Sequence, residues 1–282
     1  MKIKIVVDST AGLPEDYITR NNIEVVPLNV VIDGVSYLDG INITLEEVME
    51  SFENGAKVTT SQPSPDVFQK TFNRLRDEGV TDIICLTISS TLSGTYNSAL
   101  LAKSDVEGIN INVVDTLSAS IGSEMLIRET IDKLNEGASI TEIIDHVEKL
   151  KKNAVILINM ENLNSLKKSG RITRIKAAIG NLIRVKPILE YIDGKLSIHS
   201  KFRTDKAIFA YVIERLAVEV EKVKSKIHVY VSHVQAEERI LQLKRKIETV
   251  FNNIKVHVSR QITPVIAINI GYGGIGVSWC YE

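Results

Sequence analysis

The stretch Asp82-Ile-Ile-Cys-Leu-Thr-Ile-Ser89 is a short run of mostly apolar residues, which predicts a buried strand. It leads into Ser89-Ser90-Thr91-Leu92-Ser93-Gly94-Thr95, a cluster of hydroxyl side chains just before a predicted helix. Open α/β sheets bind ligands beyond the carboxyl ends of their strands, which is where this cluster lies. Free helix amides and hydroxyls make a seat for an anion, but serine and threonine are also common helix caps. The cluster therefore predicts either an anion seat or a cap.

Further elements are predicted around this strand. Apolar runs predict strands over Ile3 to Val7, Val25 to Ile32, Asn110 to Asp115 and Ala154 to Ile158. Helix starts are marked by two capping boxes, Thr44 with Glu47 and Ser139 with Glu142, and by the pair Ser64-Pro65. Strands that alternate with helices indicate an α/β fold with a mainly parallel sheet and helices on both of its faces.

The pattern changes after about residue 160. Asp193-Gly194 between alternating runs predicts a hairpin. Helices are predicted over Ala207 to Lys224 and Ala236 to Phe251, and strands over His228 to Val234, Val256 to Ser259 and Ile275 to Tyr281. We therefore expect an α/β domain over residues 1–160, which carries the hydroxyl clusters, and a smaller C-terminal α+β domain over residues 161–282.

Composition narrows the function classes. The chain has 282 residues, roughly two domains at about 150 residues each. Its 34 Lys and Arg against 35 Asp and Glu give a formal charge of -1, which disfavours nucleic-acid and anionic-membrane binding. Hydrophobic residues make up 44% but aromatic residues only 5%, so a pocket in this core should be aliphatic. This composition favours a flexible apolar ligand.

The two cysteines, Cys85 and Cys280, form no C-x-x-C pair, so a disulfide framework and a thiolate zinc site are excluded. A reducing cytoplasm is the expected location. The apolar run that follows Met1 is too short for a signal peptide, and no stretch approaches the length of a membrane span.

Other motifs are less specific. Thr59-Thr60-Ser61-Gln62-Pro63-Ser64-Pro65 is a second hydroxyl cluster before a predicted helix, which strengthens the anion-seat interpretation. Gly271-Tyr-Gly-Gly-Ile-Gly276 matches G-x-G-x-x-G, but too few residues follow it for a dinucleotide fold, and a tight turn is preferred. The basic segment Lys167 to Lys176 fits a solvated face, a nucleic-acid patch or an arginine aimed at an anion. Motifs for hydrolases, zinc proteases and phosphate loops are absent from the sequence, so no metal or cofactor is expected.

Several short motifs occur together in a specific order. They are Asp8-Ser9-Thr10, Thr60-Ser61-Gln62-Pro63, Ser93-Gly94-Thr95-Tyr96, Ser169-Gly170-Arg171-Ile172, Lys186-Pro187, Arg203-Thr204 and Thr263-Pro264-Val265, followed by the glycine cluster. In their order and spacing, over nearly the whole chain, the sequence resembles a DegV-family fatty-acid-binding protein. That type serves as the lipid-carrying subunit of bacterial fatty acid kinase. The resemblance implies an α/β domain, a smaller α+β domain and one acyl chain in a buried tunnel.

The resemblance also assigns residues. Thr60 and Ser93 match the hydroxyls that hold the fatty-acid carboxylate, and their neighbours Ser61 and Gly94 are expected in the same site. Arg171 matches the arginine of the family's Gly-Arg motif near the head group.

Two further positions follow from the same comparison. Arg203 matches a second arginine, which we expect to act in the encounter with the kinase. Asn269 stands where the family often has a histidine in the head-group network. Asparagine forms hydrogen bonds but carries no titrating proton, so a titrating role at this position is not expected here.

The leading hypothesis is a non-catalytic carrier of a long-chain fatty acid such as palmitate or oleate. About 14 buried methylenes at about 0.8 kcal/mol each give on the order of 11 kcal/mol before ordering costs. The sequence shows no ATP site, so phosphorylation requires a partner kinase. The alternative is a serine-dependent acyl-phosphate phosphotransferase or hydrolase, with Ser93 as nucleophile and Asp8, Asp115 or His233 as base. A nucleic-acid binder that uses the basic segment is a third hypothesis.

Overall fold

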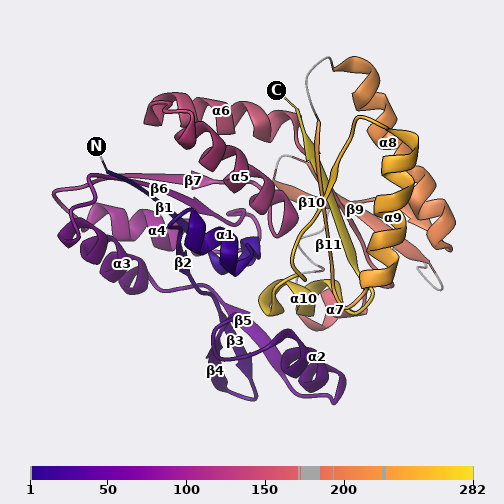
Figure 1. Ribbon diagram of the computed structural model, residues 1–282. Coiled ribbons are helices and arrows are strands. Elements are labelled where there is room, and N and C mark those ends of the chain that lie inside the picture. The colour runs from indigo at the N-terminus through magenta and orange to yellow at the C-terminus, as the bar shows by residue number, and fades with distance from the viewer. Residues whose placement is uncertain (1, 171, 173–184, 193, 224–226, 282) are drawn as a thin grey trace.

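The computed structural model describes residues 2–170, 172, 185–192, 194–223 and 227–281. A four-stranded parallel sheet has the order β2-β1-β6-β7 (Figure 1). Its strands are β1 (Ile3–Asp8), β2 (Glu24–Val26), β6 (Asp82–Thr87) and β7 (Asn110–Asp115). Because all four strands run in one direction, the loops that follow β1, β6 and β7 meet at one edge of the sheet.

Helices cover both faces of this sheet (Figure 1). Along β1, Val6 packs toward α3 (Pro65–Asp77) and α4 (Thr95–Ser104), whereas Ile5 and Val7 pack toward α5 (Ile121–Asn135) and α6 (Ile140–Asn153). The alternation follows from the two-residue period of a strand. A short helix α1 (Glu15–Arg20) and the turn η1 (Ser9–Ala11) connect β1 to β2.

A mixed six-stranded sheet forms the second half, in the order β10-β9-β8-β13-β11-β12. Its strands are β8 (Val155–Asn159), β9 (Lys186–Ile192), β10 (Lys195–Phe202), β11 (His228–His233), β12 (Val256–Val258) and β13 (Ile275–Cys280). Helices α8 (Asp205–Lys222) and α9 (Glu237–Val250) cover one face (Figure 1). Helix α5 lies between the two sheets, since Met125 packs with Ile156 and Ile158 of this sheet whereas Ile127 packs with β1.

A small antiparallel sheet, in the order β4-β3-β5, projects from the four-stranded sheet (Figure 1). Its strands are β3 (Asn29–Ile32), β4 (Val35–Leu38) and β5 (Val58–Ser61). They pack with α2 (Leu45–Glu53) and with α10 (Pro264–Ile270), a helix from the far end of the chain. A short helix α7 (Asn164–Lys168) contacts α10.

The predicted α/β fold class and its parallel sheet are confirmed. Both capping boxes form, and the hairpin joins β9 to β10. One predicted element is wrong: the run Val25 to Ile32 is two strands, β2 and β3, in different sheets. Pro27 lies between them and has no N–H to donate to a ladder.

The strand predicted over Ala154 to Ile158 is β8, which pairs antiparallel with β9 and β13 in the six-stranded sheet. Its apolar sequence is equally suitable for either sheet, because both bury their strands on two faces. The division of the chain after residue 160 stays a prediction.

Candidate functional site

A cavity of about 330 Å³ is lined by residues from the four-stranded and six-stranded sheets, with their loops, and from the small antiparallel sheet. This volume is at the lower end of the range for small-molecule sites, about 300–1,000 Å³. Its polar lining residues are Thr10, Thr60, Ser61, Gln62, Ser93, Ser120 and Asn269. The other lining residues, apart from Gly94 and Tyr191, are aliphatic: Leu28, Ile88, Leu92, Ala119, Ile158, Met160, Leu166, Leu196, Val265, Ile266 and Ile270. Within the described part of the chain, no charged side chain lines this cavity.

The topology explains why the hydroxyls converge. Thr10 follows β1, Ser93 follows β6 and Ser120 follows β7, so all three lie beyond the carboxyl ends of parallel strands. Thr60 comes from β5, whose register sets it opposite Val30 of β3. Asn269 comes from α10.

Ser93 and Gly94 lie where β6 leads into α4. The Ser93 hydroxyl is 2.9 Å from the Thr95 hydroxyl and accepts a hydrogen bond from the Thr95 amide at 3.3 Å. Gln62 crosses from the β5 loop and donates to the Ser98 hydroxyl at 3.2 Å. A Cβ atom on Gly94 would lie 2.3 Å from the Gln62 side-chain oxygen. Glycine at position 94 therefore lets Gln62 close over this end of the cavity.

Asn269 has only one side of its amide satisfied. Its Nδ2 donates to the Val265 carbonyl at 3.0 Å. Its Oδ1 is buried and has no hydrogen-bond partner among the described residues. An unpaired buried oxygen has a free-energy cost of about 1–3 kcal/mol, so this oxygen is a ready acceptor for a ligand donor or a water.

A buried carboxyl group joins the elements around the cavity. The Asp39 carboxylate accepts hydrogen bonds from the Ser9 hydroxyl at 2.7 Å and the Val265 amide at 3.0 Å. It therefore links the end of β1 to α10. Burial, and to a smaller degree the nearby Asp8, raise the pKa of Asp39 to about 6 despite these hydrogen bonds.

Of the two arginines assigned by resemblance, only Arg203 is among the described residues. Arg171 lies outside the described residues, as does half of the basic segment Lys167 to Lys176. Arg203 is exposed between β10 and α8 and is absent from the cavity lining. In the basic segment, Lys168 lies 4.7 Å above the Phe52 ring, a cation–π contact.

The candidate bases for a serine nucleophile are engaged elsewhere. Asp8 accepts from the Ile88 amide at 2.6 Å and from Thr10, and burial raises its pKa. Asp115 accepts from backbone amides, including that of Leu117 at 2.9 Å. His233 Nδ1 accepts from the Ala236 amide at 3.0 Å. Among the described residues, the hydrogen-bond partner of the Ser93 hydroxyl is Thr95, so no base activates it.

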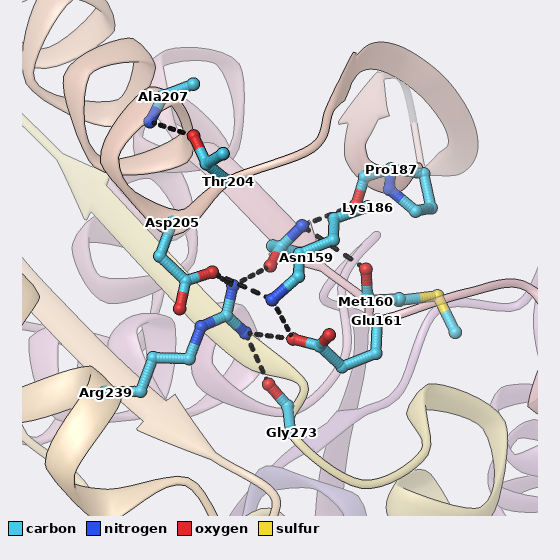
Figure 2. A network of polar contacts seen from close by, with 10 residues as sticks. All are labelled: Asn159, Met160, Glu161, Lys186, Pro187, Thr204, Asp205, Ala207, Arg239 and Gly273. Atoms are coloured by element: carbon cyan, nitrogen blue, oxygen red, sulfur yellow. Dashed lines mark hydrogen bonds and ion pairs between the residues drawn. The ribbon is translucent and has the colours of Figure 1, made fainter. Parts of the chain in front are cut away.

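An ion-pair network lies next to the cavity residue Met160 (Figure 2). Arg239 pairs with Glu161 at 3.2 Å and with Asp205 at 2.8 Å, and Lys186 pairs with the same two carboxylates at 2.8 and 3.0 Å. Arg239 also donates to Asn159 and to the carbonyl of Gly273. Lys186, Asp205 and Gly273 of the glycine cluster are therefore part of one network, next to the cavity residue Met160 (Figure 2).

The β9–β10 hairpin closes another side. The carbonyl of Gly194 accepts hydrogen bonds from the Ser89 hydroxyl at 3.0 Å and from the Thr91 hydroxyl. A Cβ atom on Gly194 would lie 2.9 Å from the Leu117 side chain, and its φ of +71° also favours glycine. The hairpin therefore joins the six-stranded sheet to the loops after β6 and β7.

Sequence reasoning missed Ser120 and Tyr191 as cavity residues, and it quoted Thr10 and Gln62 without assigning them a role. The small residues Ser118, Ala119 and Gly122 surround Ser120 between a strand and a helix, a pattern that would have indicated a tight turn there. For Tyr191, the last residue but one of β9, no local pattern gives its role.

In the described part of the chain, no cluster of three or more histidine, cysteine or acidic side chains is arranged to hold a metal ion. In the same residues, none of the helices combines the length and apolarity needed to cross a bilayer.

Comparisons with known proteins agree with this geometry. A family model described as an uncharacterised protein of the DegV family matches residues 2–282. A DegV domain-containing protein of Staphylococcus aureus (strain COL) is 36% identical over 277 residues, which is 97% of this chain and 96% of the relative. The structure of a DegV family protein from Thermus thermophilus, described for its fatty acid binding, matches with TM-score 0.93 and 30% identity over 100% of both chains. A DegV lipid binding protein from Thermotoga maritima matches with TM-score 0.85 and 32% identity over 100% of this chain and 99% of that one.

Proposed function

The chain belongs to the DegV family, and on that premise we propose that it binds one long-chain fatty acid, such as palmitate or oleate, in the cavity between its sheets. One observation carries the proposal: the cavity combines an aliphatic lining with a group of neutral hydroxyl and amide side chains. The aliphatic lining supplies affinity through burial of methylenes, at about 0.8 kcal/mol each. The polar group selects ligands that have an acid head.

We assign the carboxylate to the cluster formed by Thr60, Ser61, Ser93 and Gly94, where β5 meets the start of α4. Hydrogen bonds from these hydroxyls to a charged carboxylate are each worth about 1.5–3 kcal/mol. Asn269 is proposed to join the cluster from α10 through a bound water, because its free amide oxygen is an acceptor, and Arg171 is proposed to lie near the head group on the strength of the family motif. The small neutral donors of this cluster also leave room for the carboxylate to become an acyl phosphate.

We further propose that a partner fatty acid kinase phosphorylates the bound carboxylate in the cytoplasm, and that this chain acts as a non-catalytic carrier. Supporting this, Ser93 has no base among the described residues, and the polar end of the cavity lies near exposed Gln62. Exposed Arg203 is the proposed contact for the kinase.

The central experiment identifies the ligand. Protein purified without added lipid and then denatured should release one fatty acid per chain in mass spectrometry. Empty protein that also shows no affinity for palmitate or oleate would overturn the proposed function. Release of orthophosphate from an acyl phosphate by this protein alone would instead favour the hydrolase alternative.

Ser93→Ala is expected to weaken palmitate binding about tenfold, because it removes one hydrogen bond to a charged group. Fluorescence competition with a labelled fatty acid measures this change. Ser104→Ala is a matched control, since Ser104 is exposed at the end of α4 and absent from the cavity lining. Equal affinities for the two variants would remove Ser93 from the site.

Arg203→Ala should slow acyl-phosphate formation by a fatty acid kinase while palmitate affinity stays unchanged, because Arg203 is exposed and absent from the cavity lining. Kinase assays with [γ-32P]ATP at several carrier concentrations separate a weaker encounter from slower chemistry. Lys206→Ala is a matched control, since Lys206 is also exposed and lies at the start of α8. A rate equal to that of the control would exclude Arg203 from the kinase contact.

A further inference from the structure

Two hydroxyls of buried residues that line the cavity have no hydrogen-bond partner among the described residues. Ser120 is 5% exposed and Tyr191 is 8% exposed, and both line the cavity. Neither side-chain hydroxyl forms a hydrogen bond to another residue in the described part of the chain. Burial raises the pKa of Tyr191, so its phenol is a neutral donor at physiological pH.

Ser120 and Tyr191 belong to other elements of the fold than Thr60 and Ser61 of the carboxylate cluster. Thr60 and Ser61 come from the small antiparallel sheet, whereas Tyr191 comes from β9 and Ser120 from the loop that the hairpin contacts. Tyr191 and Ala119 belong to the same hydrophobic cluster, together with the cavity residues Leu196, Ile158 and Met160. On the basis of these neighbours, we assign the hydroxyls of Ser120 and Tyr191 to the part of the cavity that holds the acyl chain.

The backbone at Ser120 gives a further reason to look for a ligand contact. Its φ of 51° and ψ of -126° are a conformation that glycine adopts without strain and other residues adopt at a cost. Glycine at this position would remove both the strain and the unpaired hydroxyl. Phenylalanine at position 191 would likewise remove an unpaired hydroxyl, and it would keep the aromatic ring. An all-hydrocarbon chain would leave both groups unsatisfied.

We infer that the cavity contains a second polar subsite, formed by the hydroxyls of Ser120 and Tyr191, which binds an oxygen atom carried on the acyl chain. This inference rests on the proposed function, since it presumes that the chain of a fatty acid occupies the cavity. The ligand class is a fatty acid with a hydroxyl or keto group along its chain. A site built to hydrogen-bond such an oxygen discriminates against the analogue that lacks it.

The test compares octadecanoic acid with its 3-, 10- and 12-hydroxy derivatives on the full-length protein. At least one hydroxy isomer should bind about tenfold more tightly than octadecanoic acid, as expected for hydrogen bonds gained at the subsite. The double variant Ser120→Ala with Tyr191→Phe should lose that preference and bind octadecanoic acid at least as tightly as the unmodified protein. Ser232→Ala, which removes a buried hydroxyl absent from the cavity lining, should keep the preference.

Two results would overturn the subsite: no isomer is preferred to octadecanoic acid, or the double variant keeps the preference. The first result, no preference for any hydroxy isomer, is also expected if the two hydroxyls only bind an ordered water. Octadecanoic acid binding by the double variant shows that the variant is folded. Failure of every protein to bind any of the acids is a different outcome, because it overturns the proposed function together with the subsite.

Discussion

Replacing Ala119 with phenylalanine is expected to reduce the affinity for palmitate by about a hundredfold. Ala119 is buried and lines the aliphatic part of the cavity. A phenyl ring there would fill space that we assign to the acyl chain. Displacing about four methylenes at about 0.8 kcal/mol each loses about 3 kcal/mol, which corresponds to about a hundredfold in affinity.

Chain length provides an internal control for this variant. Decanoic acid needs less of the cavity, so its affinity should fall much less than that of palmitate when measured by the same competition assay. Ala210→Phe makes the same change at an exposed position on α8 and should bind both acids normally. A folded Ala119→Phe protein that binds palmitate with unchanged affinity would show that the acyl chain lies elsewhere.

Asp39 should make the folded protein less stable as the pH rises from about 4 to about 6. Burial raises its pKa to about 6 in the folded state, against 3.8 for the ordinary aspartate. Between these values the folded state holds a proton that the unfolded state has released, so raising the pH favours unfolding. At about 1.4 kcal/mol per pKa unit, Asp39 lowers the free energy of unfolding at pH 7 by about 3 kcal/mol relative to pH 4.

Urea unfolding at pH 4 and pH 7 isolates this effect when the protein is compared with Asp39→Asn. Between pH 4 and pH 7, the unfolding free energy of Asp39→Asn should rise by about 3 kcal/mol relative to that of the unmodified protein. Asp105→Asn, at an exposed position after α4, is the control for a charge change alone. A constant difference between Asp39→Asn and the unmodified protein across this range would mean that Asp39 titrates normally.

Local patterns predicted the elements whose stability is local. The capping boxes at Thr44 and Ser139 were predictable because each joins residues only three positions apart. The hydroxyl clusters at Thr60 and Ser93 were recognised as candidates from their sequence, and both line the cavity, although β5 and β6 belong to different sheets. The family resemblance added the roles of these residues.

Features that depend on distant partners were not predictable from local patterns. The sheet to which β8 belongs is decided by its pairing with β9 and β13, which the apolar sequence of the strand does not encode. Asp39 became significant only when Ser9 and Val265, far away in sequence, supplied its hydrogen bonds. The unpaired hydroxyls of Ser120 and Tyr191 are likewise visible only in three dimensions.

The position of α5 between the two sheets has a consequence for how the protein tolerates mutation. Seven consecutive residues, from Ile121 to Ile127, are buried, because one side of the helix packs against each sheet. A helix buried on both sides has no solvent-exposed stripe, so its sequence lacks the amphipathic pattern of α6. Substitutions that are neutral on the exposed face of another helix would fall on buried positions along this part of α5. Natural variation among relatives should therefore be narrow in this segment, although none of these seven residues lines the cavity.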